Sequence, residues 1–255
     1  MIAIVLISFN RLKLLKQTIE SIRKNTKMDY QLIVVDNSKD EETPKYLESL
    51  KDIIYYRFPK LDDDYEYAEH IGENTPMGKN LSTSEGTVYW DHRMTVGKSY
   101  TKGAELAPDS EYIYFVQNDM YHLPGWDTLM TKALDYEDII MVAGYSGGSS
   151  EGGRDIGDKT RLVQTVAKIP GSNMMFRRKD WDKVVAFPDY DEDNWMCGEL
   201  GTRYSKTMGL IYPYIVIHCG YTSTLVGGME TKRTKTGDWS TVETMMKQYP
   251  DIIYE

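Results

Sequence analysis

Cysteine is scarce in this sequence, which has only Cys197 and Cys219 among its 255 residues. Two cysteines are too few for the disulfide framework of a small secreted domain, so we expect a reducing compartment, the cytoplasm. Long apolar runs are also missing. The apolar start, Met1 to Ile7, has no basic region and is far shorter than a membrane span, and no later run approaches 18 apolar residues. We therefore expect no membrane anchor.

Positive charge and phenylalanine are in deficit as well. The chain has 30 Lys and Arg against 39 Asp and Glu, a formal net charge of −9. This balance argues against binding of phosphate backbones over the whole surface, although a local basic patch is compatible with it. Five phenylalanines stand against 20 tyrosines. Because a ring with a hydroxyl suits polar ligands, we expect several of these tyrosines to lie near a ligand. The six are Tyr65, Tyr67, Tyr89, Tyr100, Tyr121 and Tyr190.

What is present favours one folded α/β domain over residues 1–255. Hydrophobic residues make up 41% and charged residues 27%, which excludes a disordered or collagen-like chain. Residues 60–95 are polar and without a sustained period, so we expect an insertion or a long loop there. Residues 229–255 form a basic tail that carries Lys232, Arg233 and Lys235.

The first 40 residues carry the clearest structural pattern. Residues 3–7 and 32–35 are continuous apolar runs, typical of strands buried on both faces of a parallel sheet. Between them, residues 11–26 have apolar positions at helical spacing. Strand, helix and strand in this order predict a right-handed βαβ unit.

Further elements follow from the same criteria. We expect helices over 44–50, 96–106, 126–134, 180–185, 199–208 and 242–249, and strands over 53–58, 112–116, 139–145, 174–177 and 212–217. The glycine-rich segment 146–157 is not followed by Gly-Lys-Ser/Thr, so a surface loop is favoured there over a phosphate-binding loop.

Polar residues gather where the predicted strands end. The clusters are Ser8-Asn10-Arg11, Asp36-Asn37-Ser38, Gln117-Asn118-Asp119, and His218 alone. Ligands of open α/β sheets bind at the carboxyl ends of strands, near a switch in strand order. A carboxylate and an imidazole at adjacent strand ends can hold Mn²⁺ or Mg²⁺ and leave positions for phosphate and water. Each cluster alone is more often a turn or a cap, and their combination favours a site.

Several segments resemble, in the right order, the motifs of family 2 glycosyltransferases. They are Ile4 to Arg11, which ends in Ser-Phe-Asn-Arg; Leu32 to Ser38, similar to the family's nucleotide-binding turn; Gly97 to Ala107; Tyr112 to Trp126, similar to the Asp-x-Asp region and its Pro-Gly-Trp continuation; Asn173 to Phe187; Asp191 to Asp193; and His218. The resemblance covers about residues 1–58 and 96–220. It implies the nucleotide-diphospho-sugar transferase (GT-A) fold, an α/β fold with a single Rossmann-like, mostly parallel central sheet flanked by helices.

The resemblance also implies roles for individual residues. The nucleotide would be bound by Ser8, Asn10, Arg11, Asp36, Asn37, Lys98, Gln117 and Asn118, with Asp36 on the nucleobase or the ribose. Asp119 and His218 would bind Mn²⁺ or Mg²⁺, which bridges the diphosphate of a nucleotide sugar such as a UDP-sugar. Asp193, with Glu192 beside it, would deprotonate the acceptor hydroxyl, and an in-line base implies inversion.

The sequence departs from the family pattern at three places. Gln117 replaces the first carboxylate of Asp-x-Asp, so we expect reduced cation affinity, and the amides of Gln117 and Asn118 can bind hydroxyls instead. Tyr100-Thr101 replaces the family's Arg-Asn, which leaves Lys98 or Lys102 for the phosphates. Residues 60–95 have no counterpart in the family pattern. Apart from these departures, the acidic residues 191–193 also fit the solvated start of a helix.

The leading hypothesis is therefore a metal-dependent glycosyltransferase with a saccharide or other hydroxyl acceptor. Lys232, Arg233 and Lys235 are compatible with a second acceptor, a hydroxymethylated base in DNA. A non-catalytic module that binds nucleotide sugars is the alternative outside enzymes. A nucleotidyltransferase is less favoured, because residues 8–11 lack a glycine-rich basic loop.

Overall fold

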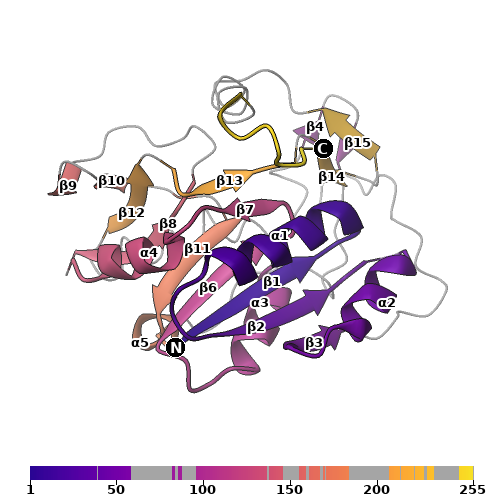
Figure 1. The fold of residues 1–255 in the computed structure, drawn as a ribbon, viewed down its shortest axis with the longest axis horizontal. Coiled ribbons are helices and arrows are strands. Elements are labelled where there is room, and N and C mark those ends of the chain that lie inside the picture. The colour runs from indigo at the N-terminus through magenta and orange to yellow at the C-terminus, as the bar shows by residue number, and fades with distance from the viewer. Residues whose placement is uncertain are drawn as a thin grey trace.

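The structure of the chain is a computed structural model. It describes residues 1–38, 40–58, 82–83, 86–87, 96–136, 138–145, 155–158, 161–166, 169, 171–183, 207–212, 214–220, 222–226, 229–232 and 247–254. Within these ranges the main body is a nine-stranded sheet with helices on both faces (Figure 1).

The main sheet takes its strands from the whole length of the chain. In spatial order they are β3 (Ile53–Arg57), β2 (Tyr30–Asp36), β1 (Ile2–Ser8), β6 (Tyr112–Gln117), β11 (Asn173–Arg177), β8 (Ile139–Ala143), β12 (Thr207–Tyr212), β10 (Arg161–Val166) and β9 (Asp155–Asp158). The helices are α1 (Leu12–Asn25), α2 (Glu42–Ser49), α3 (Val96–Glu105), α4 (Trp126–Leu134) and α5 (Arg178–Trp181). Three strand pairs lie outside this sheet: β7 (Met120–His122) with β13 (Val216–His218), β14 (Thr222–Val226) with β15 (Met229–Lys232), and β4 (Ser82–Thr83) with β5 (Gly86–Thr87).

The sheet is parallel in one half and mixed in the other. Strands β3, β2, β1 and β6 are mutually parallel, as the continuous apolar runs predict. Strand β11 is antiparallel to both β6 and β8, and β8 is parallel to β12. The expectation of one central α/β sheet is confirmed, and its parallel part is the half that begins with β1.

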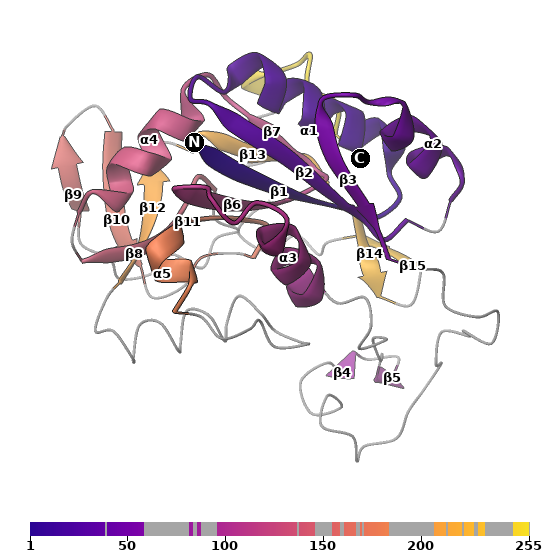
Figure 2. The same ribbon diagram turned by 90° about the horizontal axis from the view of Figure 1, so that it is seen from below.

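Strand β1 separates two hydrophobic cores, to which it contributes alternate residues. Ala3, Val5 and Ile7 face the core under α3 and α5, whereas Ile4 and Leu6 face the core under α1 and α4. Figure 2 shows α3 and α5 on one side of the sheet and α1, α2 and α4 on the other. Burial on both faces explains why the β1 sequence has no polar alternation.

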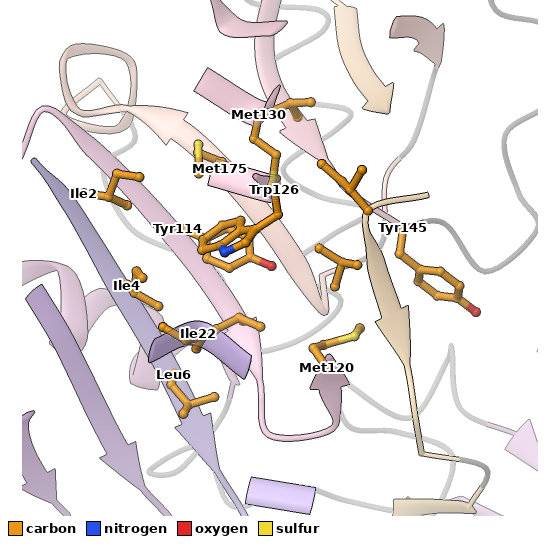
Figure 3. Packing of buried hydrophobic residues seen from close by; sticks show 14 of the residues in the cluster. Ile2, Ile4, Leu6, Ile22, Tyr114, Met120, Trp126, Met130, Tyr145 and Met175 are labelled. Atoms are coloured by element: carbon orange, nitrogen blue, oxygen red, sulfur yellow. The ribbon is translucent and has the colours of Figure 1, made fainter. Parts of the chain in front are cut away.

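Aromatic rings fill the centre of the core under α1 and α4. The ring of Trp126, at the start of α4, lies 4.5 Å from the ring of Tyr114 on β6, centroid to centroid (Figure 3). The centroid of the His122 imidazole is 4.6 Å from that of Trp126. This packing joins α4 to β6 and β7.

His122 is a fully buried, neutral imidazole. Its Nε2 lies 3.0 Å from the Tyr114 hydroxyl and its Nδ1 3.1 Å from Ser21 Oγ. Ser21 Oγ also donates a hydrogen bond to the Thr18 carbonyl, so the imidazole proton is on Nδ1 and the Tyr114 hydroxyl donates to Nε2. Burial lowers the pKa of His122 to about 3.

Helix α3 approaches β1 so closely that Gly103 has no room for a side chain. A Cβ at Gly103 would lie 2.1 Å from Cγ1 of Val5, a buried β-branched residue with little freedom to move. We therefore expect Gly103→Ala to lower the free energy of unfolding by about 1–3 kcal/mol, despite the higher helix propensity of alanine. Urea denaturation measures the change. Glu105→Ala, at an exposed position of the same helix, is the control, and equal midpoints for the two variants would contradict this packing.

The segment 247–254 returns to the N-terminal helix α1. The Gln17 side chain accepts a hydrogen bond from the Ile253 N–H at 2.6 Å and donates one to the Ile253 carbonyl at 2.9 Å. Ile252 is buried in a small cluster with Leu14, Ile217 and Cys219. The segment therefore packs against both α1 and the strand that carries His218.

Most predicted elements of the first 145 residues are confirmed, and the later ones need correction. The predicted strand over 212–217 is wrong. Strand β12 ends at Tyr212, Ile215 is a bend, and β13 begins at Val216 in a different sheet. Residues 207–208 belong to β12 rather than to the end of a helix, and the remainder of that prediction, 199–206, lies outside the described residues. The predicted insertion over 60–95 lies outside them except for 82–83 and 86–87, and residues 242–246 of the last predicted helix lie outside them as well.

The strands missed by the sequence reasoning are short or polar. They include β9, β10, β14 and β15, whose sequences have no apolar run long enough to stand out. None of the described helices is long and apolar enough to cross a membrane.

Candidate functional site

The polar strand-end clusters meet at the switch in strand order. Strand β1 lies between β2 and β6, so the chain leaves β1 toward one neighbour and returns later to the other. The three strands are parallel, and Ser8 is in register with Asp36 while Ile7 is in register with Gln117. Their carboxyl ends therefore lie at one edge of the sheet, the edge where ligands of open α/β sheets bind.

Asp119 is the centre of this edge. Its Oδ2 lies 3.1 Å from Arg11 Nη1 and 3.1 Å from His218 Nε2. The side chains of Arg11, Asp119 and His218 are 11%, 9% and 4% exposed. The Arg11 guanidinium, the Asp119 carboxylate and the His218 imidazole thus form one compact, nearly buried group, which we call the Asp119 cluster.

Strand pairing outside the main sheet brings His218 to Asp119. Strand β7 follows Asp119 directly and pairs antiparallel with β13, with Met120 in register with His218. The Cys219 N–H donates a hydrogen bond to the Asp119 carbonyl at 2.8 Å. The predicted proximity of His218 and Asp119 is confirmed, although β13 is not a strand of the main sheet as expected. Burial raises the pKa of the Cys219 thiol, and the Asp119 carboxylate adds to the effect.

Gly220 packs its backbone against the Asp119 cluster. A Cβ at this position would lie 2.3 Å from Asp119 Oδ2 and 2.6 Å from Arg11 Nη1. Glycine is therefore required here for close approach, and any side chain would force the ion pair apart.

The turn between β1 and α1 has a strained backbone. Asn10 and Arg11 have φ values of 52° and 53°, the left-handed region that non-glycine residues rarely adopt. Asn118 Nδ2 donates to the Asn10 carbonyl at 2.9 Å, and the Asn10 N–H donates to Ser38 Oγ at 2.8 Å. Asn118 is 7% exposed, so it holds this turn in place and presents the Arg11 side chain to Asp119.

Asp36 is fully buried and bonded by its neighbours. Its Oδ1 accepts a hydrogen bond from the Ser38 N–H at 3.0 Å, and its Oδ2 accepts one from the Tyr55 hydroxyl at 3.2 Å. Arg57 Nε lies 3.5 Å from the same Oδ2, and Arg57 Nη2 donates to the Ser38 carbonyl at 2.9 Å. Burial and the nearby Asp36 carboxylate raise the pKa of Tyr55. The arrangement fixes Arg57, which remains 28% exposed.

Asn37 and Ser8 connect the same edge to α3. The Asn37 N–H donates to the Ser8 carbonyl at 2.8 Å, and Asn37 Nδ2 donates to Ser99 Oγ at 2.7 Å. Ser8 Oγ lies 3.3 Å from Ser38 Oγ. Because Ser99 is in the first turn of α3, its half-buried neighbour Lys98 lies on the helix turn beside this edge.

Only some of the remaining predicted site residues lie within the described residues. Gln117 is half-buried at the end of β6, where its N–H donates to the Ser172 carbonyl at 3.0 Å. Asp193, Glu192, Arg233 and Lys235 lie outside the described residues, as do four of the six tyrosines expected near a ligand. Tyr100 is not a ligand residue, because it is fully buried in the core and donates its hydroxyl to the Gly171 carbonyl at 2.6 Å.

Three contributors to the site were not predicted. Arg57 is the last residue of β3 and is in register with Asp36, so the strand-end criterion applies to it once the end of β3 is known. Tyr55 faces the same carboxylate from within β3. Gly220 has no sequence signal apart from being a glycine two residues after His218.

The Asp119 cluster offers two of the ligands that a divalent cation needs, the Asp119 carboxylate and the His218 imidazole. Carboxylate oxygen and imidazole nitrogen are ligands that Mn²⁺ accepts. In the part of the chain that the structure describes, no group of three or more His, Cys, Asp or Glu side chains comes together.

Comparison with known proteins identifies the fold as the GT-A fold of glycosyltransferases. Residues 3–67 match the family model of glycosyl transferase family 2. No curated protein shows significant sequence similarity to the chain. GalNAc-T7, solved with UDP, GalNAc and Mn²⁺, is 11% identical with a TM-score of 0.61 over 85% of this chain and 43% of that one.

Two further solved structures are similar. The mannosyltransferase PcManGT from Pyrobaculum calidifontis, in complex with GDP-Man and Mn²⁺, is 11% identical with a TM-score of 0.51, over 81% of this chain and 53% of its own. TarS residues 1–349 from S. aureus is 14% identical with a TM-score of 0.51, over 84% of this chain and 59% of its own. The chain thus spans about half the length of these proteins.

Proposed function

We propose that this family 2-like chain with the GT-A fold is a glycosyltransferase, which moves a sugar from a nucleotide-sugar donor to an acceptor hydroxyl. The observation that carries the proposal is the Asp119 cluster, located at the switch in strand order. The similar structures of GalNAc-T7 and PcManGT, which contain Mn²⁺ with UDP or GDP-Man, support it.

The Asp119 cluster would hold the diphosphate end of the donor. Asp119 and His218 place an oxygen and a nitrogen within 3.1 Å of one another, and together they would bind Mn²⁺ or Mg²⁺. A divalent cation held by these two residues would supply positive charge that stabilises the departing diphosphate. The Arg11 guanidinium, which is planar and has several donors, would bind a phosphate oxygen.

The Ser38 side of the edge would hold the nucleoside. Arg57 is partly exposed and held by Asp36, so it would contact the donor directly while Asp36 fixes its position. Asn10 provides amide and backbone groups at the same edge, and the buried Ser8 and Asn37 support this edge through their bonds to Ser38 and Ser99. These groups suit the ribose and base, and Lys98 and the Gln117 amide would add contacts from α3 and β6.

The acceptor hydroxyl needs a base to remove its proton as the new bond forms. We assign that role to Asp193, with Glu192 beside it, and an in-line base would give inversion at the anomeric carbon. A saccharide is the acceptor that we propose, and a hydroxymethylated DNA base remains the alternative. The basic residues that favour DNA are Lys232, Arg233 and Lys235, and only the backbone of Lys232 lies within the described residues.

Nucleotide release from donor sugars tests this function. The chain is incubated with UDP-sugars, GDP-sugars and other nucleotide sugars, with Mn²⁺ and then with EDTA, and free nucleotide is measured by chromatography. We expect slow hydrolysis of one donor without acceptor, faster release when the acceptor is present, and loss of both with EDTA. Donor binding without any release would instead indicate a non-catalytic module.

A further inference from the structure

The Asp119 carboxylate is already bonded at Oδ2, the oxygen that faces His218 and that a cation shared by these two residues would need. Arg11 Nη1 and His218 Nε2 both contact Oδ2, each at 3.1 Å. The Gly220 backbone closes over the same place, because even a methyl group there would lie within 2.6 Å of Oδ2 and of Nη1. The cluster therefore has no room beside Oδ2 for a cation while the guanidinium stays in place.

We infer that Arg11 and a divalent cation compete for Oδ2 of Asp119, so that a cation held by this oxygen and by His218 enters only as the guanidinium leaves. Two positive groups repel each other strongly at contact distance in a nearly buried site, which excludes joint occupancy of Oδ2. The exchange replaces the single positive charge of the guanidinium beside Asp119 by the two positive charges of the cation. Arg11 thus blocks the cation's position on Asp119 until its side chain moves. On the premise of the proposed function, the same side chain then binds the donor.

The Arg11 backbone can stay fixed while its side chain moves. Asn118 and Ser38 hold the turn through the backbone groups of Asn10, and the Arg11 carbonyl accepts the Leu15 N–H at 3.0 Å in the first turn of α1. Release from Asp119 therefore costs no backbone contact. The freed guanidinium remains at the sheet edge that carries Ser8 and Asn37, where a diphosphate would be its new partner.

Exchange of partners couples cation and nucleotide binding. A diphosphate that binds Arg11 removes the competitor from Asp119 and thereby raises the affinity for the cation. Because coupling between two binding sites is reciprocal, the cation raises the affinity for the diphosphate by the same factor. Before the donor binds, the Arg11 guanidinium therefore serves as the counter-ion of the Asp119 carboxylate.

Titration with Mn²⁺ alone tests the competition. Free Mn²⁺ is measured by electron paramagnetic resonance with the wild type and with Arg11→Gln, in the absence of nucleotide. We expect Arg11→Gln to bind Mn²⁺ about tenfold more tightly, the factor that one hydrogen bond to a charged group represents. Arg23→Gln, which removes an exposed charge paired with Asp52, is the control and should match the wild type. Equal or weaker binding by Arg11→Gln would overturn the inference.

A second variant tests the same exchange from the other side. Asp119→Asn no longer holds the guanidinium, so with EDTA present we expect it to bind UDP several-fold more tightly than the wild type does. The gain should disappear in the double variant Arg11→Gln, Asp119→Asn, because the freed group is then absent. A gain that persists in the double variant would contradict a role for Arg11.

These measurements are independent of turnover. A chain that releases no nucleotide from any donor, yet shows tighter Mn²⁺ binding in Arg11→Gln, loses the proposed function and keeps the competition. A chain that turns over a donor without that tightening keeps its function and loses the competition.

Discussion

Asp119→Asn is expected to lower nucleotide-sugar turnover by about 10²- to 10³-fold, the range found when a group that stabilises developing charge is removed. Asp119 is the carboxylate on which both Arg11 and His218 converge. An amide in its place has almost the same shape but no charge, so it would hold a divalent cation much more weakly. Turnover is measured as nucleotide released with saturating donor and Mn²⁺.

The fold should survive this substitution. The hydrogen bond that ties β13 to this position uses the Asp119 carbonyl and the Cys219 N–H, which remain. Circular dichroism and thermal unfolding check this. Asp52→Asn is the matched control, since Asp52 is an exposed carboxylate paired with Arg23 far along the chain from the cluster. Turnover within about twofold of the wild type in Asp119→Asn would remove Asp119 from the mechanism.

Acidification is expected to unfold the protein through His122. Its pKa is about 3 in the folded chain, against about 6.5 for an exposed histidine. Between these values the unfolded state binds a proton that the folded state does not. The stability that the neutral imidazole contributes is therefore complete above pH 6.5 and is lost as the pH falls, at up to about 1.4 kcal/mol per pH unit.

Urea denaturation at several pH values between 8 and 4.5 measures this slope. His122→Gln loses the ring packing against Trp126 and is expected to be less stable at pH 8, with a flatter dependence on pH. Ser21→Ala is the control, because it removes the partner of Nδ1 but leaves the imidazole in place. Parallel curves for the wild type and His122→Gln would show that His122 does not determine the acid sensitivity.

The sequence was most informative where one strong local pattern decides the structure. Residues 3–7 and 32–35 are strands because helices bury both of their faces, and the polar residues after them are at the sheet edge for the same reason. The sequence therefore predicted that residues such as Ser8, Arg11 and Asp119 gather in one place. It also predicted most helices within a few residues.

The later part of the chain depends on contacts between distant residues, which a local pattern does not contain. Residues 212–217 have the composition of one strand, yet β12 belongs to the main sheet and β13 pairs with β7. The contact between Asp119 and His218 results from that pairing. Likewise, the Arg57 side chain contacts Asp36 because β3 pairs with β2 in the register that places these two residues side by side.

The contact between Gln17 and Ile253 has a consequence for the order in which the chain is assembled during synthesis. Its partners are 236 positions apart, and Leu14 beside it is covered by Ile217 and Ile252. At ribosomal rates, roughly 10 to 50 s separate the synthesis of α1 from that of the residues that cover it. Until those residues are made, the nascent chain has an apolar face on α1, and between the synthesis of Asp119 and that of His218 the Asp119 cluster lacks its histidine. The first strands can pair early, whereas the candidate site is completed only after β13, which carries His218, has been made.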